Sequence, residues 1–262
     1  MRPYNFDADK EIGHITEWIK DYFIENGPNS KAVIGISGGK DSTVAAALLV
    51  RTLGAENVVG VLMPEGEQSD ISDSYKVCNL LGIQEYELNI GPACNDLYAQ
   101  LHDCDLETNS TIKTNTPARL RMTTLYMIAA AVGGRVVNTC NLSEDYVGYS
   151  TKYGDLAGDF SVFKNYTVQE VLAIGDELGL PRELVHKTPS DGMCGKSDED
   201  NLGFTYAELD KYLSEGVYPE YETMKRIQEL HKRNVHKQCI NLPAPEPVSF
   251  YRRPVCFTEI NF

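Results

Sequence analysis

The sequence has 262 residues, of which 42% are hydrophobic and 24% are charged, and its formal net charge is −14. This length favours one domain, or two small ones, and the composition is that of a soluble globular protein with enough apolar residues for a large core. So acidic a chain repels nucleic acid over most of its surface, which argues against a nucleic-acid partner.

The sequence carries no pattern typical of a membrane or secreted protein. No run reaches the ~18 apolar residues that a membrane-spanning helix needs, and the opening segment MRPYNFDADK lacks the apolar stretch of a secretory signal. The seven cysteines are scattered singly without a CxxC pair, which argues against a disulfide framework and against a four-thiolate zinc site. We therefore expect a cytoplasmic protein with reduced thiols and no membrane partner.

Hydrophobic spacing divides the chain into alternating strands and helices. The predicted strands are 31–37, 57–64, 83–90 and 134–140. The predicted helices are 14–26, 42–53, 70–81, 116–132, 205–213 and 220–234, so that Pro117 falls in a first helical turn, where proline is tolerated. Short strands separated by helices predict an α/β fold, with a parallel sheet flanked by helices on both faces. Such a sheet binds ligands at the carboxyl ends of its strands.

The loop between the first predicted strand and its helix reads Ser37-Gly38-Gly39-Lys40-Asp41-Ser42. Glycines let the backbone approach a ligand closely, and the following helix points its free N–H groups and positive dipole end at that ligand. This combination predicts a phosphate cradle. It is not a Walker A loop, which would need glycine at position 34 and a hydroxyl at position 41. An aspartate beside phosphates needs a cation between them, so Asp41 indicates bound Mg²⁺.

The same six residues match the S-G-G-x-D-S signature of the PP-loop ATP pyrophosphatases, with their adenine-nucleotide α-hydrolase-like fold. Four further stretches resemble ammonia-dependent NAD synthetases along nearly the whole chain: ARLRM at 118–122, NTCNLSE at 138–144, GYSTKYGDLAGD at 148–159, and KTPSDGMCGKSDEDNLGFTY at 187–206 with a late VHK. The resemblance implies a ligase that amidates deamido-NAD with ammonia and ATP, through an adenylated intermediate, releasing AMP and pyrophosphate. It also implies a homodimer.

The resemblance assigns roles to particular residues. Asp41 and Glu144 lie just beyond the first and fourth predicted strands, where they can hold Mg²⁺, and with Asp159 they form the predicted catalytic set. Asp159 is also expected to help bind or deprotonate ammonium. The predicted ATP contacts are Gly35, Ile36, Ser37, Gly38, Gly39, Lys40, Asp41, Ser42, Thr139 and Ser190. The predicted deamido-NAD contacts are Arg119, Lys152, Asp159, His236 and Lys237, which gather positive charge for an anionic dinucleotide in an acidic protein.

Three positions depart from the family pattern. Val168 stands where the family has an ATP-binding lysine, and we expect Lys40 or Lys164 to supply that charge instead. Asn138 replaces a glycine and is expected to narrow the backbone's approach to ATP. CNLSE resembles the glutamine-using branch, but a glutaminase needs its own domain of at least ~100 residues. We therefore expect one NAD synthetase domain over residues 1–262, without a glutaminase domain.

Two alternative functions share the glycine loop, and the motifs also predict one conformational change. A PP-loop enzyme acting on tRNA should have a basic surface, and its thiolating forms have paired catalytic cysteines. A non-catalytic nucleotide-binding module would keep the glycine loop, but would have little use for Glu144 together with the dinucleotide-binding cations. The segment Pro189–Gly203, with glycines at 192, 195 and 203, is expected to close over the site and exclude water.

Overall fold

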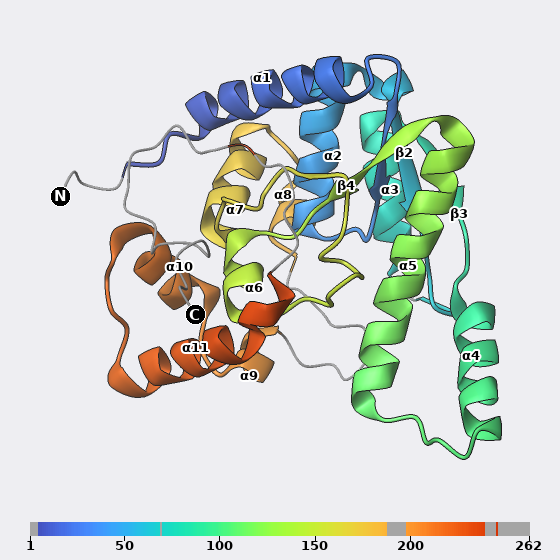
Figure 1. Ribbon diagram of the computed structural model, residues 1–262. Coiled ribbons are helices and arrows are strands. Elements are labelled where there is room, and N and C mark those ends of the chain that lie inside the picture. Colours follow the sequence, from blue (N-terminus) through green and yellow to red (C-terminus); the bar gives the residue numbers. More distant parts are fainter. Residues whose placement is uncertain (1–4, 69, 188–197, 239–244, 246–262) are drawn as a thin grey trace.

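The computed structural model describes residues 5–68, 70–187, 198–238 and 245 (Figure 1). Its strands form a five-stranded parallel sheet in the order β3-β2-β1-β4-β5. The strands are β1 (Lys31–Gly35), β2 (Val58–Leu62), β3 (Gln84–Glu87), β4 (Gly134–Asn138) and β5 (Phe160–Ser161).

Helices account for most of the remaining described residues. The α-helices are α1 (Ala8–Asn26), α2 (Lys40–Leu53), α3 (Ile71–Leu81), α4 (Gly91–Asp103), α5 (Ser110–Val132), α6 (Leu142–Val147), α7 (Val168–Glu177), α8 (Arg182–Val185), α9 (Asp198–Leu202), α10 (Tyr206–Glu215) and α11 (Tyr221–Asn234). Two 3₁₀ turns, η1 (Ala55–Asn57) and η2 (Val235–Lys237), complete the described elements.

The sheet separates two apolar layers. On one face, α1, α2, α3 and α7 pack a core around the fully buried Ile15, Ile34 and Leu48. On the other face, α5 covers β1, β2 and β4 through Met122 and Leu125. Figure 1 shows α1, α2 and α7 on one side of the sheet and α5 with α4 on the other. Because both faces are covered, the central strands are almost wholly apolar and buried, as parallel strands generally are.

A third apolar cluster lies beyond the sheet, among α6, α7, α9, α10 and α11. Leu209, Leu213 and Ile227 are at its centre, each almost completely buried. This cluster fixes α6 and the start of α7 against the late helices. It therefore holds the segments that follow β4 and β5.

The strand order reverses between β1 and β4, and this reversal positions the site. The chain passes from β1 to β2 on one side, whereas β4 pairs with β1 on the other side, with Ala32 opposite Arg135. The connections therefore diverge at the carboxyl ends of these two strands, which leaves a crevice where open α/β sheets bind their ligands. The loop at 36–39 and the loop at 139–141 both begin there.

The expected fold class is confirmed, and all four predicted strands are present. The predicted start of the helix at 116 is wrong. α5 begins at Ser110, where the Asn109 side chain accepts a hydrogen bond from the Ile112 backbone N–H and caps the helix, so that Pro117 lies in the helix interior. Among the described residues, no helix is long and apolar enough to span a membrane.

Candidate active site

The 37–42 loop is closed by its own hydroxyl groups. The Gly39 N–H donates to Ser37 Oγ at 3.2 Å, and Ser37 Oγ lies 3.1 Å from Ser42 Oγ. The Thr43 hydroxyl donates to the Gly39 carbonyl at 2.7 Å. These short bonds fix the turn from β1 into α2, whose first helical residue is Lys40. The unpaired N–H groups of the first turn of α2 then face the crevice.

Gly38 is the position in this loop that requires glycine. Its φ is +76°, in the left-handed region that side chains disfavour. A Cβ there would lie 2.8 Å from Cβ of Asp73 and 3.0 Å from the Ser74 backbone nitrogen. The loop therefore packs directly on the start of α3, and a larger residue would push it out of place.

Asp41 and Glu144 are brought together around one ammonium group. Lys40 Nζ lies 2.8 Å from Asp41 Oδ2 and 3.7 Å from Glu144 Oε1. The Lys40 side chain is only 8% exposed, and the two carboxylate side chains are 18% and 17% exposed. The expectation that these two acids face each other across adjacent strands thus agrees with their placement.

Asn141 links the two elements that carry these acids. Its Oδ1 accepts the Glu144 backbone N–H at 3.0 Å, which caps α6. Its Nδ2 donates to Asp41 Oδ1 at 3.1 Å, across one hundred residues of sequence. Asn141 is fully buried, so one amide holds both the helix that carries Glu144 and the carboxylate of Asp41. Sequence reasoning did not assign this role, because nothing in the local pattern predicts the long-range contact.

Burial and mutual repulsion shape the charges at this site. Burial raises the pKa of Glu144, the Asp41 carboxylate raises it further, and Lys40 opposes both. Burial works to lower the pKa of Lys40, but the neighbouring Asp41 and Glu144 carboxylates outweigh it and raise that pKa above its ordinary value. Two partly buried acids thus share a single lysine, and a further cation at this site would favour the ionised form of Glu144.

The chemistry of this donor set fits magnesium. Mg²⁺ is held in proteins by one or two carboxylates, with substrate phosphates and water completing its shell. Asp41 and Glu144 are two such carboxylates beside a loop whose backbone N–H groups suit phosphate. Within the described residues, no group of three or more histidine, cysteine, aspartate or glutamate side chains forms a metal cage.

The residues expected to bind the dinucleotide lie together, apart from Asp159. Arg119 Nε donates to the Lys152 carbonyl at 3.2 Å, and Lys152 Nζ donates to the His236 carbonyl at 2.9 Å. Lys237 Nζ donates to the carbonyls of Gly148 and Ser150 at 2.8 and 3.0 Å. α5, the 148–159 loop and η2 thus lie together, and they bring Arg119, Lys152 and Lys237 into one cluster.

Asp159 lies elsewhere, at the edge of β4. Its Oδ2 accepts the Val136 backbone N–H at 2.7 Å, and its Oδ1 accepts the Tyr126 hydroxyl at 3.3 Å. These bonds tie the start of β5 to β4 and α5. The ammonium-handling role of Asp159 stays a prediction. Thr139 directly follows β4, whereas Ser190 lies outside the described residues, as does most of the predicted closing segment.

Asn138 has a structural role that sequence reasoning missed. Its Nδ2 donates to the carbonyls of Asp155 and Ala157 at 2.7 and 3.1 Å. Its Oδ1 accepts from the Cys140 backbone N–H and the Ser161 hydroxyl, both at 3.1 Å. The side chain thus holds the 148–159 loop against the end of β4.

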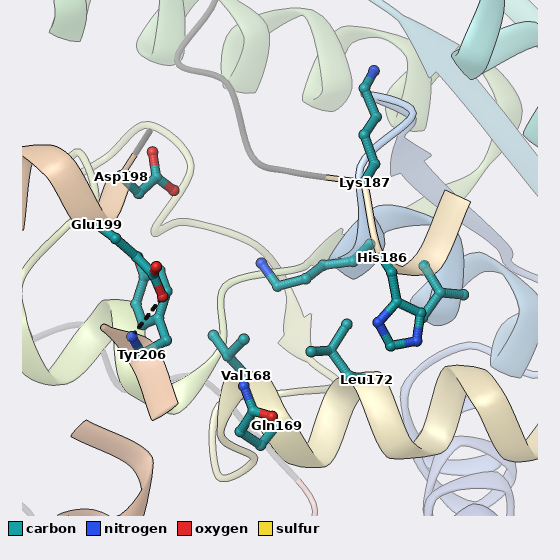
Figure 2. A pocket seen from close by; sticks show the side chains of 10 residues that line it. Val168, Gln169, Leu172, His186, Lys187, Asp198, Glu199 and Tyr206 are labelled. Carbon is teal, nitrogen blue, oxygen red and sulfur yellow. Dashed lines mark hydrogen bonds between the residues drawn. The ribbon is translucent and has the colours of Figure 1, made fainter. Parts of the chain in front are cut away.

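A cavity of about 260 Å³ adjoins Lys40. It lies between the starts of α7 and α10, the end of α8 and the start of α9, and Figure 2 shows several of the side chains that surround it. Its lining residues are Lys40, Val168, Gln169, Leu172, Val185, His186, Lys187, Asp198, Glu199 and Tyr206. Lys187 is held by Asp70 and Asp73 at 3.0 and 2.7 Å, and not by the two acids that hold Lys40.

Tyr206 also lines this cavity, and the sequence did not predict a role for it. Its ring centroid lies 6.0 Å from Lys40 Nζ, its side chain is buried, and its hydroxyl has no hydrogen-bond partner among the described residues. Its backbone N–H donates to Glu199 Oε1 at 2.8 Å, the dashed line in Figure 2. The aromatic ring forms part of the wall beside the ammonium group.

The parallel sheet, its strand order and the glycine loop at its reversal point define an α/β protein of the PP-loop class. The family model described as NAD synthase matches residues 11–247. An NH3-dependent NAD(+) synthetase of Thermoplasma acidophilum is 36% identical over 244 residues, which cover 90% of this chain and 97% of that protein. The chain belongs to the NAD synthase family.

Solved structures give the same result. The NMN synthetase of Francisella tularensis superposes with a TM-score of 0.83 at 34% identity, covering 91% of this chain and 98% of that one. The NAD+ synthetase of Burkholderia pseudomallei superposes with a TM-score of 0.73 at 26% identity, covering 90% and 92%. The family that the motifs predicted is therefore confirmed by both kinds of comparison.

Proposed function

We propose that this chain converts deamido-NAD to NAD, using ATP and ammonia and releasing AMP and pyrophosphate. The observation that carries the proposal is the pair of acids at the carboxyl ends of β1 and β4, Asp41 and Glu144, gathered beside the glycine loop. Membership of the NAD synthase family supports the choice of reaction.

The chemistry needs orientation and charge stabilisation more than a covalent nucleophile on the protein. A nicotinate carboxylate oxygen attacks the α-phosphorus of ATP, the bond to the bridging oxygen breaks, and pyrophosphate leaves. Ammonia then adds to the acyl carbon, loses a proton, and expels AMP to leave the amide. Bound magnesium would neutralise phosphate charge, with Asp41 and Glu144 holding it. The amides at Gly38 and Gly39 would bind phosphate, and Arg119 and Lys152 would bind the dinucleotide.

We infer that Lys40, not Lys164, supplies the positive charge that Val168 lacks. Lys40 and Val168 line the same cavity beside the glycine loop. The charge of Lys164 instead acts on the Asp145 carboxylate. Lys40→Ala should raise the KM for ATP and Lys164→Ala should not. An unchanged KM in Lys40→Ala, or a raised KM in Lys164→Ala, would contradict this inference.

The test of the reaction is a complete assay with its omissions. Incubation with ATP, Mg²⁺, deamido-NAD and ammonium should form NAD, AMP and pyrophosphate in equal amounts. Omitting any one component should abolish NAD formation, and glutamine should not replace ammonium. Binding of ATP without turnover would instead support a nucleotide-binding module. Modification of tRNA with indifference to deamido-NAD would support a tRNA enzyme.

A second candidate substrate is nicotinate mononucleotide. The observation that favours it is the similarity to the Francisella NMN synthetase, with a TM-score of 0.83 and 34% identity. The same amidation on a mononucleotide would need the PP-loop site but no pocket for the second nucleotide. Parallel measurement of kcat/KM for deamido-NAD and for nicotinate mononucleotide separates the candidates. We expect the higher value for deamido-NAD, and the reverse ratio would assign the mononucleotide.

We also propose that the chain acts in the cytoplasm, as a homodimer with one synthetase domain in each copy. Free thiols at Cys78, Cys94 and Cys140, all buried, suit a reducing compartment. Exposed apolar side chains on α5, Tyr126 and Met127, give a surface on which a second copy can pack. Light scattering after size-exclusion chromatography should give twice the chain mass, and a single chain mass would contradict the dimer.

A further inference from the structure

Lys40 holds a position that a metal ion would also need. Its ammonium group bridges the two acids, at 2.8 Å from Asp41 and 3.7 Å from Glu144, and its side chain is 8% exposed. Carboxylates in such surroundings need a compensating cation, because burial penalises an unpaired charge severely. In the described structure, Lys40 is the cation that the acids contact.

The ammonium group and a divalent ion would compete for the same two carboxylates. A magnesium ion binds oxygen at about 2.1 Å, inside the space that Lys40 Nζ holds between the acids. A cation at Nζ would also repel an ion bound there, by an amount that is large in a partly buried site. Occupation by one cation therefore disfavours occupation by the other.

The cavity beside Lys40 can accommodate its displaced ammonium group. Its backbone is fixed at the first residue of α2, but its four-carbon stem rotates. The cavity of about 260 Å³ next to it is lined by Lys40 itself, by Tyr206 and by Asp198. An ammonium group turned into that cavity would keep an aromatic face and a carboxylate near it, so the move would not leave its charge unaccompanied.

We propose that Lys40 is an internal counter-ion, which occupies the two-carboxylate site in the metal-free protein and is displaced into the adjoining cavity when a divalent cation binds. Metal alone then binds weakly, because it must first displace the lysine. A nucleotide phosphate in the cavity gives the displaced ammonium group an anionic partner. Metal and nucleotide therefore bind cooperatively. This inference rests on the metal site of the proposed function.

The direct test measures the Kd for Mn²⁺ in the absence of nucleotide. Electron paramagnetic resonance reports the concentration of the free ion during the titration. Lys40→Gln removes the competing charge and should tighten Mn²⁺ binding at least tenfold relative to the wild type. Lys187→Gln is the matched control, since Lys187 lines the same cavity but pairs with Asp70 and Asp73, and it should change the Kd less than twofold. Equal or weaker binding by Lys40→Gln than by the wild type would overturn the inference.

A measurement on the wild-type chain covers the case in which the variant does not fold. Acetic anhydride acetylates exposed amines, and mass spectrometry reports the extent at each lysine. Added Mg²⁺ should raise acetylation of Lys40 several-fold while leaving Lys187 unchanged, and Glu144→Gln should abolish the increase. Unchanged acetylation of Lys40 in a chain that binds Mn²⁺ would refute the displacement. Absence of Mn²⁺ binding even with ATP would instead refute the metal site of the proposed function.

Discussion

Glu144 is one of the two acids at the centre of the site, and its substitution tests the proposed reaction directly. Glu144→Gln keeps the shape of the side chain but removes one of two charges that would stabilise a bound ion. Loss of such an electrostatic contact costs roughly 10²-fold in rate. We expect kcat for NAD formation to fall by at least that factor, while the protein still folds.

The control for this change is Glu183→Gln, because Glu183 is exposed on the short helix α8. It should leave kcat within twofold of the wild type. If Glu144→Gln retained wild-type turnover at saturating Mg²⁺, Glu144 would not belong to the catalytic site.

Two substitutions of Asn141 distinguish its role in capping α6 from its role in positioning Asp41. Asn141→Ser keeps a good capping oxygen for α6 but is too short to reach Asp41, whereas Asn141→Ala loses both contacts. We expect both variants to lose at least tenfold in kcat/KM for ATP. Only the alanine variant should also lose the cap, which contributes about 1 kcal/mol of stability in urea unfolding. Full activity in the serine variant would show that the amide does not position Asp41.

At the scale of single residues, sequence motifs pointed to the two acids but not to the residues that hold them in place. Asp41 and Glu144 were assigned because motif and strand order both place them at the reversal point. Asn141, Tyr206 and Lys187 were not, since their roles depend on contacts with segments far along the chain. The structural role of Asn138 was missed for the same reason, because its four hydrogen bonds are visible only in the fold.

Among the elements, α10 is tied to the active site by one buried acid. The Ser143 hydroxyl donates to Asp210 Oδ1 at 2.5 Å, and the Gln169 backbone N–H donates to Asp210 Oδ2 at 2.8 Å. Asp210 thus joins α10 to α7 and to α6, which carries Glu144. Burial raises the pKa of Asp210 from 3.8 to about 7, although these two hydrogen bonds oppose the shift.

The raised pKa gives stability a definite pH dependence. The folded protein holds the Asp210 proton more tightly than the unfolded chain, so this group's contribution to stability falls as pH rises from about 4 to about 7. Asp210→Asn cannot ionise and keeps the shape of the side chain. Its free energy of unfolding relative to wild type should therefore increase between pH 5 and pH 8, by at least about 1 kcal/mol.

Denaturant unfolding at the two pH values measures this difference. Asp21→Asn, on the exposed face of α1, is the control and should show no such trend. A difference for Asp210→Asn that stayed constant, or that decreased with rising pH, would contradict the assignment.

The elements that the sequence predicted are those with a strong apolar pattern. β1, β2 and β4 were found because their residues are mostly buried and apolar, whereas β3 is mostly exposed and was found from the apolar residues that flank it. β5 has only two residues and left no pattern. α4, α6, α7, α8 and α9 were also missed. The start of α5 was misplaced because the Asn109 cap was overlooked and Pro117 was taken as an initiation signal.

Over the whole molecule, the net charge of −14 sets which anions can approach. Small nucleotides can be bound by a local group of cations, but a polyanion must cover the acidic surface as well. We expect no retention of tRNA by the protein in filter binding at physiological salt, and no inhibition of NAD formation by excess tRNA. Saturable tRNA binding under these conditions would show that the charge argument fails.

The overall architecture was predictable because local patterns and global topology agree. Strand–helix alternation predicted the parallel sheet, and the glycine loop lies where the strand order reverses. The third cluster, around Leu209 and Ile227, was not predictable as a unit, because it is assembled from helices that lie far apart in sequence. That cluster determines how α6 presents Glu144 to the crevice.

The central claim is that Asp41 and Glu144 together hold one divalent ion against a bound nucleotide. Crystals grown with Mn²⁺ and a non-hydrolysable ATP analogue test it directly, because manganese gives an anomalous signal that locates the ion. We predict one ion about 2.1 Å from a carboxylate oxygen of each acid, and in contact with the phosphates. An ion bound elsewhere, or a nucleotide bound with the two carboxylates apart and no ion between them, would contradict it.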